Sequence, residues 1–178
     1  MPTSPALWVF GYGSLIWDPG FPVAERRIAR AVGWQRSFCM RSIHHRGTPE
    51  APGLVLALDR ADDASCTGVA LRVKAGAEAA TLAALREREL VSSAYLETHL
   101  PVMTDFGAVK ALTYVIDPDH VQYCGSLPLD DQARIIAHAI GKRGANRDYL
   151  TATVAHLAKL GISDPTLEWL DAEVQKIV

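Results

Sequence analysis

Cysteine is scarce in this sequence, and its few copies follow no recognisable pattern. The 178 residues include three cysteines, Cys39, Cys66 and Cys124. An odd number of widely spaced cysteines without a C-x-x-C pair indicates neither a disulfide framework nor a thiolate zinc site. The adjacent His44 and His45 have no third ligand at metal spacing. We therefore expect reduced thiols and no metal site.

A strong excess of one charge and long apolar runs are also missing. Lys and Arg number 18 against 20 Asp and Glu, a net charge of -2, whereas proteins that bind nucleic acids through phosphates usually carry a basic excess. No run approaches the ~20 apolar residues that cross a bilayer. Residues 1–6 lack the basic and apolar segments of a secretory signal. The sequence predicts a soluble, cytoplasmic protein without a nucleic-acid or membrane partner, and it does not indicate an oligomeric state.

The remaining composition is that of a globular protein. Hydrophobic residues make up 49% and charged residues 21% of the chain, which is enough apolar material for a sizeable core. No linker, repeat or low-complexity tract interrupts the sequence. We therefore predict a single domain over residues 1–178.

Short apolar runs dominate the first two thirds of the chain. Each has strand length and is bounded by Gly, Pro or Asp. These runs cover residues 7–12, 34–40, 53–58, 67–73, 95–103 and 109–116. Between them, Glu78–Leu90 is rich in helix formers and contains no Gly or Pro, which predicts an inserted helix.

The last third has the punctuation of three helices. One is expected between Pro128 and Gly141, and the next is expected to be capped by Asn146 and to end at Gly161. The third is expected to begin at Asp164-Pro165. Many strands followed by helices predict an α+β fold, with a mainly antiparallel sheet or small barrel, an inserted helix and a C-terminal helical segment.

The segment Gly11-Tyr12-Gly13-Ser14-Leu15-Ile16-Trp17 directly follows the first predicted strand. Its two glycines permit backbone angles that let N–H groups converge on an oxyanion or a carboxylate. It is not a dinucleotide motif, because Ile16 fills the position of the last glycine. A tight turn at the end of a strand explains the same residues.

Arginines gather in the first third of the chain. Residues 1–58 contain six arginines and three acids, a local excess that suits an anionic small molecule or a solvated surface. Arg41 belongs to this set and precedes the polar segment His44–Pro49. Cys39 lies close enough in sequence to His44 to suggest a Cys–His nucleophile, but closeness in sequence does not establish the spatial pair that catalysis needs.

Two acids end the predicted inserted helix. Glu87 and Glu89 alternate with Arg86 and Arg88. Helix residues two apart point to different faces, so one glutamate should be buried and the other solvated. A surface ladder of alternating charges is the other interpretation.

Together these segments resemble the ChaC-like γ-glutamylcyclotransferases, which degrade glutathione to 5-oxoproline and cysteinylglycine. The resemblance covers nearly the whole chain. Its five blocks are Val9–Trp17, His45–Pro49 with Pro52-Gly53, Arg88-Glu89, Tyr123–Gly125 and Gly144–Leu150. The family's catalytic glutamate follows an arginine and precedes a tyrosine by six residues, as Glu89 does with Arg88 and Tyr95, whereas Glu87 has no tyrosine at that offset.

The resemblance implies a γ-glutamylcyclotransferase-like fold with Glu89 as the catalytic acid and base. It implies a substrate site formed by Val9, Phe10, Gly11, Tyr12, Gly13, Ser14 and Leu15, with Arg41, Tyr95 and Tyr123 as further candidates. This sequence departs from the family at Ala94, where glycine is usual, and at His44, where aspartate is common.

The reaction implied by the resemblance needs no cofactor, because the substrate's own α-amine attacks its γ-carbonyl. We therefore expect glutathione as a small-molecule substrate and no cofactor. Two alternatives stay open. One is a related cyclotransferase acting on other γ-glutamyl amines or amino acids, and the other is a γ-glutamyl-peptide binding module that has lost catalysis.

Overall fold

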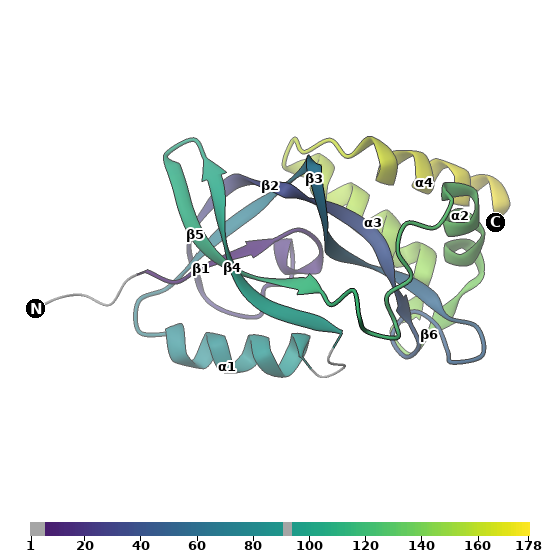
Figure 1. Ribbon diagram of the computed structural model, residues 1–178, viewed down its shortest axis with the longest axis horizontal. Coiled ribbons are helices and arrows are strands. Elements are labelled where there is room, and N and C mark those ends of the chain that lie inside the picture. Colours follow the sequence, from purple (N-terminus) through teal and green to yellow (C-terminus); the bar gives the residue numbers. More distant parts are fainter. Residues whose placement is uncertain (1–5, 91–93) are drawn as a thin grey trace, which may run out of the picture. The chain divides into compact units, whose positions relative to one another are not determined.

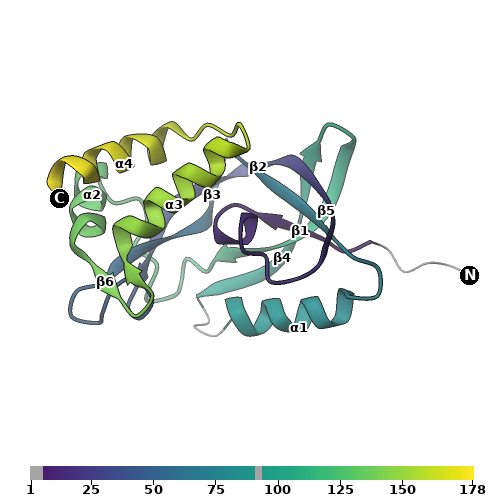
Figure 2. The ribbon, with the colours of Figure 1, turned by 180° about the vertical axis from the view of Figure 1, so that it is seen from behind.

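The computed structural model describes residues 6–90 and 94–178 (Figures 1 and 2). The expectation about a secretory signal concerned residues 1–6, of which only Ala6 lies within these ranges. The chain divides into two compact units. The first unit comprises Met1–Gln35 and Leu58–Asp117, and the second comprises Arg36–Ala57 and Pro118–Val178. The single domain over the whole chain stays a prediction. None of the described helices is long and apolar enough to span a membrane.

Five strands form a closed barrel in the order β1-β3-β2-β4-β5. The strands are β1 (Trp8–Gly11), β2 (Val23–Ser42), β3 (Gly53–Val73), β4 (Tyr95–Thr104) and β5 (Gly107–Ile116). The β1–β3, β2–β4 and β4–β5 pairs are antiparallel, whereas β1 and β3 each touch β5 in parallel. The predicted α+β class with a mainly antiparallel barrel is therefore confirmed.

Strands β2 and β3 are longer than the sequence predicted. The runs at 53–58 and 67–73 belong to one strand, β3, and β2 begins at Val23 rather than near residue 34. Both added stretches contain consecutive charged residues, Glu25–Arg27 in β2 and Asp59-Arg60 with Asp62-Asp63 in β3, and most of these side chains lie outside the core. A search for continuous apolar runs does not detect strands that carry such groups of charged residues.

Helix α1 (Glu78–Glu89) lies alongside β1 and β4 in the first unit, as both ribbon views show (Figures 1 and 2). Leu85 of this helix is buried in one core cluster with Val9 of β1 and Leu112 and Tyr114 of β5. The inserted helix was predicted correctly, and its contact with the barrel fixes the position of its C-terminal end.

The second unit contains α2 (Leu129–His138), α3 (Asn146–Lys159) and α4 (Pro165–Ile177), which contact one another in pairs. Helix α4 begins as predicted, because the Asp164 carboxylate accepts the N–H of Leu167 at 3.1 Å. Helix α2 ends before Gly141, because the chain turns there into the short hairpin of β6 (Ile140–Gly141) and β7 (Gly144–Ala145).

The prediction that Asn146 caps α3 is wrong. Asn146 is the first residue of α3 and makes no side-chain cap. Its amide is fully buried, accepts the N–H of Leu54 at 2.8 Å and donates to the carbonyl of Leu54 at 2.8 Å. An amide satisfies a donor and an acceptor at once, so Asn146 attaches α3 to the start of β3 instead of closing the helix end.

Candidate active site

The segment predicted to bind an anion is a tight turn after β1. The strand ends at Gly11, and the chain forms a single 3-10 turn, η1 (Ser14–Ile16). The N–H of Ile16 donates to the carbonyl of Gly13 at 2.9 Å. The first two N–H groups of the turn precede this bond and have no carbonyl to meet within the turn, so they are the donors a ligand could use. A tight turn at the end of the strand and a segment with donors for an anion are therefore compatible interpretations.

A glycine that sequence analysis did not single out makes room for this turn. A Cβ on Gly68 of β3 would lie 2.3 Å from the carbonyl oxygen of Gly11 and 3.0 Å from the ring of Phe10. A Cβ on Gly11 would lie 3.2 Å from that of Leu15. The close approach of β3 to the end of β1 thus requires glycine at Gly68, and only the barrel register reveals this.

The larger side chains of the predicted substrate segment belong to the core. Val9 and Phe10 are fully buried, and Leu15 is nearly so. Tyr12 is buried, and its hydroxyl donates to the carbonyl of Tyr114 at 2.8 Å. These side chains hold the segment in place, so a ligand would meet mainly its backbone and its short polar residues.

Glu89 is the last residue of α1 and is largely buried. Its side chain is 17% exposed, whereas Glu87 is exposed. The expectation that one glutamate is buried and the other solvated is confirmed. Burial raises the pKa of Glu89, and the positive charge of Arg88 opposes part of this rise. The carboxyl group therefore holds a proton more readily than an exposed glutamate does, which suits a group that accepts a proton and later donates it.

Arg88 connects this glutamate to the turn after β1. Its Nη1 donates to the carbonyl of Asp18 at 2.6 Å, and its Nη2 donates to Oγ of Ser14 at 3.0 Å. Its Nε lies 3.4 Å from Oε1 of Glu89. The planar fork of an arginine can bind three groups in fixed directions. Arg88 thus holds the end of α1 and the turn in one arrangement.

A second polar group, which sequence analysis missed, lies on β4 and β5. The Tyr114 hydroxyl donates to Oε1 of Glu97 at 3.0 Å, and Arg86 pairs with Glu97 at 3.0 Å. The Arg86 hydrogen bond lowers the pKa of Glu97. Burial and the Glu97 carboxylate raise the pKa of Tyr114, with a further contribution from the charge of Glu89. Tyr114 therefore lies within electrostatic reach of Glu89.

Tyr95 begins β4 in the same unit as Glu89. It is partly buried and packs against the core cluster that contains Leu85 and Tyr114. The preceding Ala94 is buried, and its carbonyl accepts the N–H of Asp117 at 2.8 Å. Tyr95 is therefore anchored beside the barrel core.

Arg41 and Tyr123 belong to the second unit. Met40 pairs with Tyr123 in an antiparallel bridge, and the N–H of Arg41 donates to the carbonyl of Gln122 at 2.8 Å. Successive residues of paired strands face opposite sides, so Arg41 and Tyr123 lie on different faces of this pairing. Their role as substrate-binding residues stays a prediction.

The segment with His44 and His45 is held by the hairpin of β6 and β7. The carbonyls of these histidines accept the N–H groups of Lys142 at 2.8 Å and Arg143 at 2.9 Å. Burial lowers the pKa of His45, and the neighbouring cations, Arg143 first among them, add to this effect. A Cβ on Gly47 would lie 2.1 Å from the N of Gly53. Tight backbone packing thus explains the glycine at position 47 in the segment His45–Pro49.

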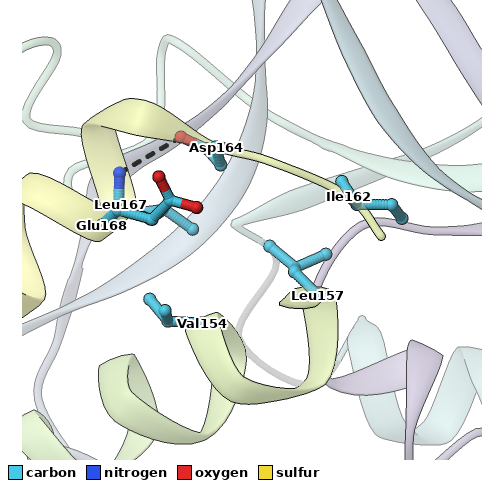
Figure 3. Close-up of a pocket in the computed structure, with 6 residues that line it drawn as sticks. All are labelled: Val154, Leu157, Ile162, Asp164, Leu167 and Glu168. Carbon is cyan, nitrogen blue, oxygen red and sulfur yellow. Dashed lines mark hydrogen bonds between the residues drawn. The ribbon is translucent and has the colours of Figure 1, made fainter. Parts of the chain in front are cut away.

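A hollow in the second unit lies between α3 and α4 (Figure 3). Its empty volume is about 150 Å³, less than the roughly 300–1,000 Å³ of ordinary small-molecule sites. Its lining is Val154, Leu157, Ile162, Asp164, Leu167 and Glu168. The Asp164 carboxylate is already engaged at the start of α4 and in an ion pair with Arg36 at 2.9 Å. The hollow is a feature of helix packing.

Among residues 6–90 and 94–178, no cluster of three or more His, Cys, Asp or Glu side chains could hold a metal ion.

Comparisons with known proteins agree with this geometry. The sequence model of the family described as ChaC-like protein matches residues 7–177. The glutathione-specific gamma-glutamylcyclotransferase of Escherichia coli K12 is 36% identical over 178 residues, which cover 99% of this chain and 76% of that protein. The glutathione-specific gamma-glutamylcyclotransferase 1 of Danio rerio is 34% identical, with 94% of this chain and 88% of that protein covered.

The fold agrees as well. A crystal structure of the gamma-glutamyl cyclotransferase specific to glutathione from yeast matches with a TM-score of 0.87 at 24% identity, over 97% of each chain. The expected γ-glutamylcyclotransferase-like fold is therefore confirmed. By the family match over residues 7–177 and by its similarity to these relatives, the chain belongs to the ChaC-like protein family.

Proposed function

We propose that this protein is a γ-glutamylcyclotransferase that degrades glutathione to 5-oxoproline and cysteinylglycine, with Glu89 as the general base and acid. The observation that carries the proposal is the joining of the largely buried Glu89 to the turn after β1 through Arg88. A carboxyl group with a raised pKa and a turn with backbone donors are the two groups that this reaction needs.

The reaction is a ring closure within the substrate. The α-amine nitrogen attacks the γ-carbonyl carbon, a five-membered lactam forms, and the bond from this carbon to the cysteine nitrogen breaks. An ammonium group cannot attack, so Glu89 first accepts a proton from the α-ammonium and later donates it to the leaving nitrogen. After the attack, the ring nitrogen loses its second proton to water, and one N–H remains in the lactam. Holding the two reacting ends together can remove about 7–11 kcal/mol of the barrier, so much of catalysis consists of binding the substrate folded.

The turn after β1 supplies the complementary charge. Its backbone donors would bind the α-carboxylate or the oxyanion that develops on the γ-carbonyl oxygen. The relevant segment is Gly11–Leu15, whose Ser14 is held by Arg88. Tyr95, in the same unit as Glu89, is a candidate for the wall of the substrate site.

The choice of glutathione rests on the relatives. The proteins from Escherichia coli and Danio rerio are named glutathione-specific, and both are more than 30% identical to this chain. The substrate-binding roles of Arg41 and Tyr123, which face opposite sides of their pairing in the second unit, stay predictions. Because reduced glutathione is maintained in the cytoplasm, a cytoplasmic location is part of this proposal.

The test is release of 5-oxoproline from glutathione by paired variants. Glu89→Gln keeps the size of the side chain but cannot carry the proton, so kcat should fall about 100-fold or more. Glu87→Gln is the matched control, because Glu87 is exposed on the same helix end, and it should keep the activity of the unmodified protein. Near-normal turnover by Glu89→Gln would overturn the assignment of the catalytic residue.

The same assay separates the alternatives. A γ-glutamyl-peptide binding module would gain thermal stability with glutathione and yield no cysteinylglycine. A cyclotransferase for other substrates would prefer γ-glutamyl-alanine to glutathione when both are supplied together.

A further inference from the structure

Two of the three cysteines lie opposite each other in the second unit. Cys39 is near the end of β2, and Cys124 lies in the segment that follows β5. The N–H of Cys124 donates to the carbonyl of Cys39 at 2.8 Å. The next pair along, Met40 and Tyr123, forms an antiparallel bridge. Cys39 and Cys124 are therefore the pair next to Met40 and Tyr123 in the same antiparallel pairing.

This register places the Cys39 and Cys124 side chains directly opposite each other on one face of the pairing. Because the Cys124 N–H donates to the Cys39 carbonyl, the two cysteines occupy a hydrogen-bonded pair, in which Cα atoms lie about 5.5 Å apart and the side chains leave the same face. Disulfides join residues with Cα atoms about 4.4–6.8 Å apart. The Cα separation expected for Cys39 and Cys124 falls within this range, and a small shift that brings the Cβ atoms together would close the bond.

The two thiols differ in access, and the third cysteine lies elsewhere. Cys39 is fully buried, whereas Cys124 is partly buried, and neither forms a disulfide in this structure. Cys66 is buried within β3, in the first unit. An external reagent would therefore meet Cys124 first, and Cys39 would react only with a group already attached to Cys124.

We propose that Cys39 and Cys124 form a reversible dithiol–disulfide pair that takes a low-molecular-weight disulfide as its oxidant. The oxidised pair covalently links β2 to the segment that carries Tyr123. Redox state is thereby coupled to a segment predicted to bind substrate.

The reaction proceeds in two exchanges. The Cys124 thiolate attacks one sulfur of the small disulfide, forms a mixed disulfide and releases one small thiolate. The Cys39 thiolate then attacks the Cys124 sulfur, forms the internal disulfide and releases the second small thiolate. The two cysteines lose two electrons and two protons in total, and the small disulfide gains them as two thiols.

The local environment makes the first exchange slow. Burial raises the pKa of the Cys124 thiol, and the positive charge of Arg41 opposes part of this rise. Since the thiolate is the nucleophile, the pair should stay reduced during brief exposure to an oxidant and respond to sustained oxidation.

The experiment uses the folded protein and hydroxyethyl disulfide at pH 8. This reagent has no γ-glutamyl group, so the result does not depend on the proposed enzymatic activity. After overnight incubation, remaining thiols are alkylated in acid, and intact mass and non-reducing peptide maps are recorded. We expect a loss of two hydrogens, a Cys39–Cys124 linked peptide, alkylation of Cys66 alone, and full reversal by dithiothreitol.

Three variants control the assignment. Cys66→Ser should form the linked peptide like the unmodified protein. Cys124→Ser should show no internal disulfide, and Cys39→Ser should stop at one hydroxyethylthio group on Cys124. The proposal would be overturned by a protein that stays fully reduced, by one that stops at a mixed disulfide while both cysteines are present, or by a linkage that includes Cys66.

Discussion

Ionisation of Glu89 is unfavourable in the folded protein, because burial raises its pKa above that of an unfolded chain. The folded state therefore binds this proton more tightly than the unfolded state does. Its contribution to the free energy of unfolding is fully present at low pH and declines as the pH rises from the ordinary pKa of glutamate through the raised value.

Glu89→Gln should therefore stabilise the protein at neutral pH while removing activity. We expect its thermal midpoint to exceed that of the unmodified protein at pH 8, and the difference to shrink toward pH 4, where both side chains are uncharged. Thermal denaturation across this range measures the effect, with the exposed Glu87→Gln expected within about 0.5 kcal/mol of the unmodified protein. A higher midpoint for the unmodified protein at pH 8 would contradict the assigned environment of Glu89.

Arg88 should act as a positioning residue with an electrostatic effect. Its charge lowers the pKa of Glu89, so Arg88→Gln should raise that pKa and move the acidic limb of the profile of kcat/KM against pH to higher pH. Arg88→Lys keeps the charge but not the fork that binds Asp18 and Ser14. It should restore the limb while kcat/KM stays about 10-fold lower. A limb that does not move in Arg88→Gln would exclude the electrostatic role.

The resemblance to the ChaC-like family predicted Glu89 through its offset from Tyr95, but it did not predict the groups around Glu89. The fork of Arg88 reaches a turn about 70 residues away, and the Tyr114–Glu97 contact depends on the register of β4 and β5. Neither contact has a local pattern. Glu89 as the reacting carboxylate therefore stays a prediction from the family resemblance, whereas its electrostatic environment depends on tertiary structure.

At the scale of elements, the sequence predicted the helices whose boundaries or composition are marked by neighbouring residues. The start of α4 follows from Asp164-Pro165, and α1 follows from its composition. The full lengths of β2 and β3 were not predictable from apolar runs, because consecutive charged residues interrupt both strands. The role of Asn146 was also hidden, since its partner Leu54 is distant in sequence.

Asn146→Ala tests the attachment of α3 to β3. The substitution removes both hydrogen bonds to Leu54 and leaves a buried N–H and C=O without these partners. We expect the free energy of unfolding to fall by about 2–3 kcal/mol. The exposed Asp148→Asn in the first turn of α3 is the control, with an expected change of less than about 1 kcal/mol. Urea denaturation measures both, and equal stabilities would show that Asn146 is not an anchor.

At the scale of the whole molecule, two strands belong to both compact units. The division falls between Gln35 and Arg36 within β2 and between Ala57 and Leu58 within β3. A unit that unfolds alone would have to break these strands in their interior. The single domain stays a prediction, and because β2 and β3 run through both units we expect the two units to unfold in one transition.

Tryptophan positions allow this to be measured. Trp8, Trp17 and Trp34 lie in the first unit and Trp169 in the second, so in a Trp169→Phe background fluorescence reports on the first unit alone. Adding Asn146→Ala weakens only a contact inside the second unit. If β2 and β3 couple the units, the urea midpoint from fluorescence should fall by the same amount as that from far-ultraviolet circular dichroism, to which α2–α4 contribute strongly. A shift in circular dichroism with unchanged fluorescence would instead establish two independently folding units.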